Sequence, residues 1–76
     1  PFNPVTTIGY ELKRGGLVNI SVYNITGELT EILQNSYQPP GYHSINWNAS
    51  GHSSGVYFCR LSAGSYRKTI KMLLVK

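Results

Sequence analysis

The feature that most constrains this chain is a two-residue alternation of apolar and polar side chains, interrupted at short intervals by glycine and proline. In residues 7–12 every second side chain is apolar, and a similar period recurs in residues 17–24 and 66–75. Successive side chains of an extended strand point to opposite faces, so each of these segments predicts a strand with one apolar face. No segment sustains a helical period, and the chain is therefore predicted to be all-β.

The glycine and proline residues divide the chain into six expected strands, at residues 5–13, 17–24, 28–33, 42–48, 56–62 and 66–75. The third strand breaks strict alternation, which predicts a β-bulge or a twist at a sheet edge. Residues 34–41 include Pro39 and Pro40 and are expected to form a crossover loop outside the sheets. Turns are expected at residues 14–16, where both glycines would accept positive φ, and at residues 24–27 and 63–65. Residues 48–55 predict a polar surface loop.

Strands that each have one apolar face can bury those faces against one another in two packed antiparallel sheets. The predicted fold is an immunoglobulin/fibronectin-III-like antiparallel β-sandwich of six to seven strands, with residues 1–76 as a single domain. Tyr57 begins a late strand after a loop, which is typical of a tyrosine corner, where the hydroxyl bonds to upstream backbone. The expected core comprises Ile8, Tyr10, Ile20, Val22, Ile45, Trp47, Tyr57, Cys59, Leu61 and Met72.

The chain lacks the residue patterns of an enzyme. It contains no Asp, and its three Glu are expected on polar strand faces or near a turn, which leaves no carboxylate pair for acid–base chemistry. His43 is expected to be a partly buried packing residue, and His52 to be solvated in its loop. Together with Cys59, the two histidines would still lack the fourth ligand that a structural zinc site needs. A Cys59–His43 pair would lie in the core, whereas a reactive thiolate needs an accessible, electropositive setting. We therefore expect no catalytic residue, no metal and no cofactor.

The charged residues are few and mostly basic, with seven Lys and Arg against three Glu and a net charge of +4. Basic residues gather near the end of the chain, at Arg67, Lys68, Lys71 and Lys76. One interpretation is an anionic partner such as lipopolysaccharide, a membrane surface or nucleic acid. The other is a solvated strand face whose lysines protect a sheet edge. We favour the second and expect no nucleic-acid partner, because the run is broken and no aromatic residues interleave with it.

Several sequence pieces together resemble the type IX secretion C-terminal sorting domain (type A), over essentially the whole chain. The related immunoglobulin-like domain of the flagellar hook-capping protein shares much of this pattern. Each piece is weak alone, but their spaced combination is specific. The pieces are the opening Pro1-Phe2-Asn3-Pro4, residues 22–27, a Gly-x-x-x-x-x-Trp spacing that ends at Trp47, Gly55-Val56-Tyr57-Phe58, and the closing Lys71-Met72-Leu73-Leu74-Val75-Lys76.

The resemblance implies a non-catalytic module at the C-terminal end of a longer secreted protein from a Bacteroidetes-like bacterium. Such a module is recognised by secretion-machinery proteins at the outer membrane, and it is often cleaved as its cargo is attached to surface lipopolysaccharide. The resemblance also implies that Lys71–Lys76 carry the sorting signal. Pro1–Pro4 would belong to an N-terminal motif that usually follows Tyr-Pro-Asn, so the front edge is expected to be trimmed. The expected location is secreted or on the cell surface.

Two alternatives stay open at this point. One is a structural subunit of an extracellular filament or surface layer that forms homo-oligomers by strand exchange, with Pro1–Thr7 pairing to a neighbour's sheet edge. The other is a carbohydrate-binding module that uses Tyr23, Tyr37, Tyr42 and Tyr66.

Overall fold

The computed structural model describes residues 5–75, and this part of the chain forms six strands and no helix. It accordingly contains no helix that would span a membrane. The strands match the expected positions closely except for the third. They are β1 (Val5–Leu12), β2 (Gly16–Asn24), β3 (Leu29–Gln38), β4 (Gly41–Asn48), β5 (Gly55–Ala63) and β6 (Tyr66–Leu74).

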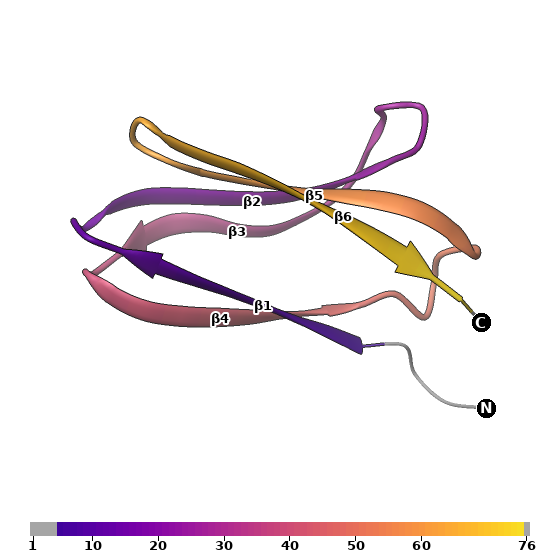
Figure 1. Ribbon diagram of the computed structural model, residues 1–76, viewed down its shortest axis with the longest axis horizontal. Helices are drawn as coiled ribbons and strands as arrows, with labels where there is room; N and C mark the ends of the chain where they lie inside the picture. Colours follow the sequence, from indigo (N-terminus) through magenta and orange to yellow (C-terminus); the bar gives the residue numbers. More distant parts are fainter. Residues whose placement is uncertain (1–4, 76) are drawn as a thin grey trace.

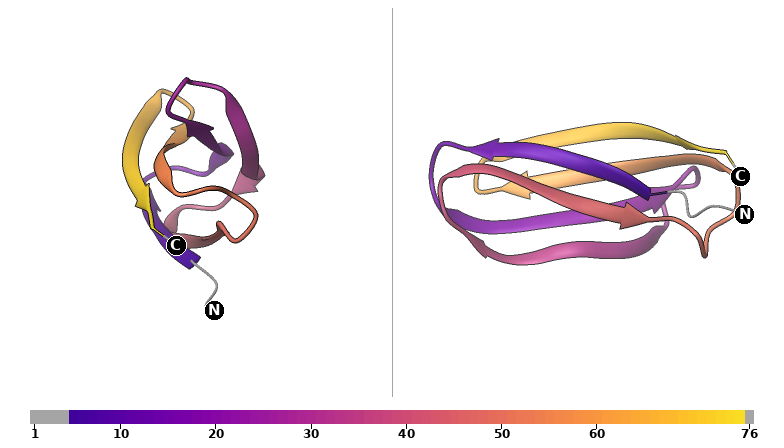
Figure 2. Two further views of the ribbon diagram at one scale, coloured as in Figure 1. Left: turned by 90° about the vertical axis from the view of Figure 1, so that its right-hand side faces the viewer. Right: turned by 90° about the horizontal axis from the view of Figure 1, so that it is seen from below.

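The strands form two layers, which confirms the predicted antiparallel sandwich of the immunoglobulin-like class (Figure 1). One sheet pairs β1 with β4, and the other has the order β3-β2-β5-β6. All neighbouring strands are antiparallel. The chain passes between the sheets at residues 13–15, 39–40 and 49–54, so each layer is built from segments far apart in the sequence (Figure 2).

The two ends of the sandwich hold different parts of the chain. We call one the hairpin end; it carries the connections at residues 13–15, 39–40 and 64–65. We call the other the terminal end; it carries residues 25–28, the loop at residues 49–54, the start of β1 and the end of β6 (Figures 1 and 2). The end of the last strand therefore lies beside the beginning of the first.

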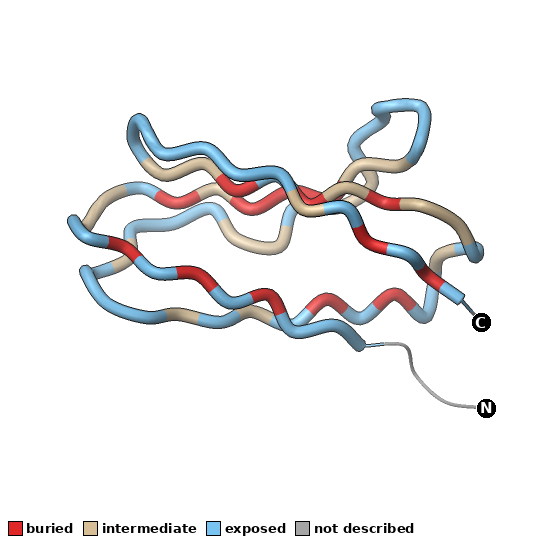
Figure 3. The backbone as a smooth tube through the Cα atoms, in the orientation of Figure 1, coloured by how far each residue is buried: buried red, intermediate tan, exposed pale blue. Residues whose placement is uncertain are grey.

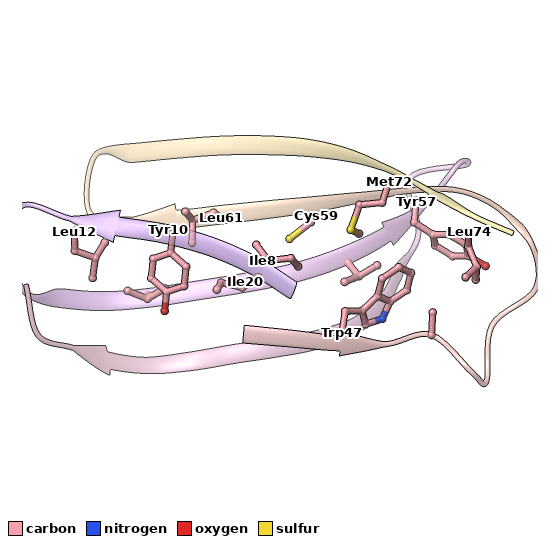
Figure 4. Close-up of a cluster of buried hydrophobic side chains, with 13 residues drawn as sticks. Ile8, Tyr10, Leu12, Ile20, Trp47, Tyr57, Cys59, Leu61, Met72 and Leu74 are labelled. Carbon is pink, nitrogen blue, oxygen red and sulfur yellow. The ribbon is translucent and has the colours of Figure 1, made fainter. Parts of the chain in front are cut away.

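The core lies between the layers, and along each strand buried and exposed residues alternate as expected (Figure 3). Nine of the ten residues expected in the core are buried, and Ile45 is partly buried and packs against them. The full set of buried hydrophobic side chains is Ile8, Tyr10, Leu12, Val18, Ile20, Val22, Trp47, Ala49, Tyr57, Cys59, Leu61, Met72 and Leu74 (Figure 4).

The third strand is longer than predicted, and the expected crossover loop at residues 34–41 was wrong over most of its length. Residues 34–38 continue β3 and pair with the first half of β2, so only Pro39 and Pro40 connect β3 to β4. The apolar alternation fails here because the positions opposite the buried Val18 and Ile20 are the polar Ser36 and Gln34, at the edge of the sheet. The expected bulge is confirmed, because the register between β2 and β3 shifts at two places.

Two glycine-containing turns show different reasons for glycine. Gly27 has φ 87°, as expected for the turn that follows β2, and its backbone N–H donates to the Asn24 carbonyl at 3.0 Å. The expectation of positive φ at Gly15 and Gly16 was wrong, because neither adopts it. At Gly15 an added Cβ atom would instead meet the hydroxyl of Tyr37, so glycine there lets the exposed tyrosine side chain lie close to the backbone.

Candidate functional site

The last strand combines a buried face with an exposed one. Within residues 5–75, β6 pairs only with β5 and forms an edge of the four-stranded sheet. Met72 and Leu74 are 8% and 5% exposed, whereas Leu73 and Val75 are 71% and 66% exposed, and Lys71 is also exposed. The candidate sorting residues therefore divide into a core half and an accessible half. Lys76 and the N-terminal motif Pro1–Pro4 lie outside the described residues.

The buried half of β6 is held by its neighbour strand and by the terminal end of the core. Met72 lies opposite Tyr57 in the β5–β6 register, and Leu74 lies opposite Gly55. Figure 4 shows Met72 and Leu74 on the side of the core that also holds Trp47 and Tyr57. Apolar contacts between the sheets therefore fix the position of β6, and with it the directions in which the accessible side chains point.

Three aromatic rings close the terminal end. The ring centroids of Trp47 and Tyr57 lie 5.3 Å apart in an edge-on arrangement, and His52 lies 5.6 Å from Trp47 and 5.7 Å from Tyr57. Edge-on aromatic pairs at such distances stabilise by about 0.5–1.5 kcal/mol beyond the area they bury. The cluster joins β4, the 49–54 loop and β5 into one packed unit beneath the end of β6.

The tyrosine corner predicted from the sequence is confirmed. The Tyr57 hydroxyl donates a hydrogen bond of 2.8 Å to the backbone carbonyl of Ser53, four residues upstream. Because the ring is buried, this bond satisfies the phenol and also fixes the loop to β5. The loop therefore enters the last hairpin in a defined conformation.

His52 and Glu31 make contacts that the sequence does not predict. The expectation that His52 is solvated was wrong, since its side chain is 23% exposed and its Nε2 lies 3.3 Å from Glu31 Oε1. The same carboxylate oxygen accepts a hydrogen bond of 3.2 Å from Trp47 Nε1. Glu31 was expected on a polar face or near a turn, but it pairs with the buried Val22 in register and so points towards the inner side. The partners lie 16 and 21 residues apart, and no local pattern signals such contacts.

The remaining chemically versatile side chains are engaged in packing. Cys59 is fully buried, and burial raises the pKa of its thiol, which disfavours a nucleophilic thiolate. His43 donates from Nε2 to the Pro39 carbonyl at 2.7 Å and stacks on Tyr10. Among residues 5–75, no three His, Cys, Asp or Glu side chains are grouped so as to hold a metal ion.

The four tyrosines considered for carbohydrate binding do not share a surface. Tyr23 and Tyr37 lie on the outer face of the four-stranded sheet, as their register with inward-facing neighbours requires. Tyr42 lies on the outer face of the other sheet, where its ring covers Gly9. Tyr66 follows the turn at the hairpin end, beside a depression of about 590 Å³ that lies at the opposite end from the tip of β6.

Comparison with known proteins gave one informative result. A family model described as "Secretion system C-terminal sorting domain" matches residues 1–76, which is the whole chain. Neither the curated proteins nor the solved structures contain a significant match. The match covers both halves of β6 and the aromatic residues that support it.

Proposed function

Because the chain belongs to the secretion system C-terminal sorting domains, the type IX signals of secreted or cell-surface bacterial proteins, we propose that it carries a cargo protein to the bacterial surface. In this proposal the chain forms the C-terminal part of a longer secreted protein. Its family interacts with the secretion machinery and is non-catalytic in general. We extend this to the present chain, which would act by presenting a folded surface and not by chemistry.

The observation that carries the proposal is the two-faced structure of β6. Met72 and Leu74 anchor the strand in the core, while Lys71, Leu73 and Val75 face outwards and are available to a partner. A recognition segment on a rigid element loses little conformational entropy when it binds. We therefore assign the sorting signal to residues 71–76, with its outward side chains as the part that the machinery reads.

The test is a reporter protein fused to the chain and expressed in a bacterium with a type IX pathway. Removing residues 71–76 is expected to trap the reporter in the periplasm, and normal export of the truncated fusion would refute the proposal. Truncation also removes Met72 and Leu74 from the core, so it confounds loss of a signal with loss of folding.

A second variant separates these causes. Leu73→Ser with Val75→Ser removes only exposed apolar side chains, and is expected to keep the thermal transition while export falls. The matched control is Leu17→Ser with Tyr37→Ser, which changes side chains of comparable exposure at the hairpin end, away from the tip of β6. Equal export by both variants would show that the outward side chains are not what is recognised.

Self-assembly by strand exchange stays a second candidate, because β1 and β6 each have only one strand partner within residues 5–75. Unpaired edges can template pairing with another chain. Sedimentation that finds only monomer at high concentration would exclude this candidate. Attachment to lipopolysaccharide is tested by comparing the amount of exported reporter that is released into the medium by cells with and without that glycolipid.

A further inference from the structure

The outer face of the four-stranded sheet is apolar at the terminal end. The β2 residues Val18, Ile20 and Val22 point into the core, so the residues between them point outwards, and register carries this alternation across the sheet. One outward row runs Leu29, Tyr23, Phe58 and Lys71; the next runs Ile32, Ser21, Arg60 and Thr69. Val56 and Leu73 form a short row beyond them. We call the six apolar members the outer patch: Tyr23, Leu29, Ile32, Val56, Phe58 and Leu73.

The outer patch is accessible and closely packed. Leu29 and Ile32 are each 52% exposed, and Leu73 is 71% exposed. Ser21 lies between them on the same face yet is only 4% exposed, because its larger neighbours cover it. Towards the hairpin end the same face carries a polar row, Asn35, Asn19, Ser62 and Arg67, and beyond it the exposed pair Leu17 and Tyr37. Most of the apolar side chains of this face thus lie in the outer patch at the terminal end, and a polar row separates them from Leu17 and Tyr37.

The charges on this face have one sign. Arg60, Arg67 and Lys71 are its cations, and no outward position of the four strands is a carboxylate. The guanidinium carbon of Arg60 lies 5.4 Å from the ring centre of Tyr23, within the patch. Glu28 is nearby in sequence, but its carboxylate accepts hydrogen bonds from Asn24 and Thr26 in the turn.

The outer face of the β1–β4 sheet provides the contrast. Its outward residues are mostly polar, and they include Glu11 and no Lys or Arg. Thr7 donates to Asn46 across the two strands at 2.8 Å, and Tyr42 covers Gly9. The two outer faces of the molecule therefore differ in both polarity and charge.

We propose that the outer patch docks onto a protein of the secretion machinery that presents an apolar surface bordered by carboxylates. This inference rests on the proposed function and enlarges the recognised surface from β6 to the outer face of all four strands. Leu73 and Lys71 belong to both surfaces, so the two are continuous. Aromatic and Arg side chains at the centre of a patch are typical of residues that dominate binding energy.

Charge favours a protein partner over a second copy of this chain and over an anionic lipid surface. A second copy would place Arg60, Lys71 and Arg67 against the same cations, which like-charge repulsion opposes. An anionic lipid surface attracts each cation by about 1 kcal/mol, and segments that bind such surfaces gather four to eight of them. Three cations spaced over a sheet fall short of that. A protein with carboxylates around an apolar centre satisfies both features of the patch.

The test exchanges apolar side chains for threonine, which keeps strand propensity. In the reporter fusion, Leu29→Thr with Ile32→Thr is expected to lower export about tenfold, while the melting temperature stays within about 5 °C of the parent. The control pair Leu17→Thr with Tyr37→Thr is exposed on the same outer face but lies at the hairpin end, and it is expected to export normally. Arg60→Glu is expected to lower export more than Arg14→Glu at the hairpin end.

A photoreactive p-benzoylphenylalanine gives a readout that does not depend on stability. Placed at position 32 it is expected to crosslink to a machinery protein, and placed at position 44, on the other outer face, it is not. The proposal is overturned by normal export of the Leu29/Ile32 variant, or by equal crosslinking at both positions. Loss of binding to phosphatidylglycerol vesicles, or loss of self-association, in parallel with export would reassign the patch to lipid or to a second copy. If truncation of residues 71–76 blocks export and the patch variants do not, only this inference fails.

Discussion

The terminal end and the hairpin end of the sandwich are built from the same six strands but are stabilised differently. At the terminal end, three aromatic rings, a hydrogen-bonded loop and the turn after β2 fix the chain through side-chain contacts. At the hairpin end, Leu17 and Tyr37 are 64% and 68% exposed, and the turns carry Lys13 and Arg14. The hairpin end has fewer such contacts, chiefly the bond from His43 to the Pro39 carbonyl and the bond from Arg67 to the Gly64 carbonyl. Both ends close the same core, but the terminal end is the more strongly reinforced.

The difference indicates where precision is needed. The accessible side chains of β6 and the outer patch lie at the reinforced end, and a surface that a partner reads must hold its geometry without the partner. The hairpin end has only to connect strands, so local turn chemistry is sufficient there. Three pairs of substitutions test this contrast, beginning with the largest expected effect.

Trp47→Ala is expected to lower the free energy of unfolding by about 3–5 kcal/mol, because it empties the centre of the aromatic cluster. Tyr37→Ala at the hairpin end is expected to change it by less than about 0.5 kcal/mol, since that ring is mostly exposed. Thermal unfolding followed by circular dichroism measures both. Comparable losses would show that the ends are equally reinforced.

Gly27→Ala is expected to cost about 1–2 kcal/mol, because φ 87° is unfavourable for a residue with a Cβ atom. Gly16→Ala is the matched change near the hairpin end, where φ is not positive and an added Cβ meets nothing within 4 Å. It is expected to be neutral or stabilising by up to about 1 kcal/mol, through lower entropy of the unfolded chain. The urea unfolding midpoint of Gly27→Ala should fall, and that of Gly16→Ala should stay unchanged or rise; a comparable fall in both contradicts this account.

Tyr57→Phe is expected to cost about 0.5–1.5 kcal/mol, because it removes the bond to the Ser53 carbonyl and keeps the buried ring. In a chain of this size that corresponds to a fall in melting temperature of roughly 4–8 °C per kcal/mol. Tyr66→Phe at the hairpin end serves as the control and should melt with the parent. An unchanged transition in Tyr57→Phe would mean that the corner does not stabilise the loop.

Local alternation was sufficient to predict most of the fold. The inward side chains of β6, the tyrosine corner and the bulge in β3 all follow from spacing and residue type, because period-two patterns report directly on strand faces. The extension of β3 through Gln38 was not predictable in this way, since its inward positions, Gln34 and Ser36, are polar. The contact of Glu31 with Trp47 and His52 was missed because it depends on how the two layers meet, which no single segment encodes.

The candidate site shows the same limit. Residues 71–76 were singled out from their resemblance to a family, and β6 shows which of the described ones are exposed and which are buried. The outer patch was not foreseen, because its members come from four strands and adjoin one another only through register. A surface of this kind becomes visible only after the strand order is known.

The buried thiol of Cys59 can serve as an internal probe of the folded state. With none of its surface exposed, the thiol reacts with an alkylating reagent only when the layers separate. The labelling rate therefore measures how often the sandwich opens. Compared before and after passage out of the cell, it would report whether the domain travels folded or is threaded as an open chain.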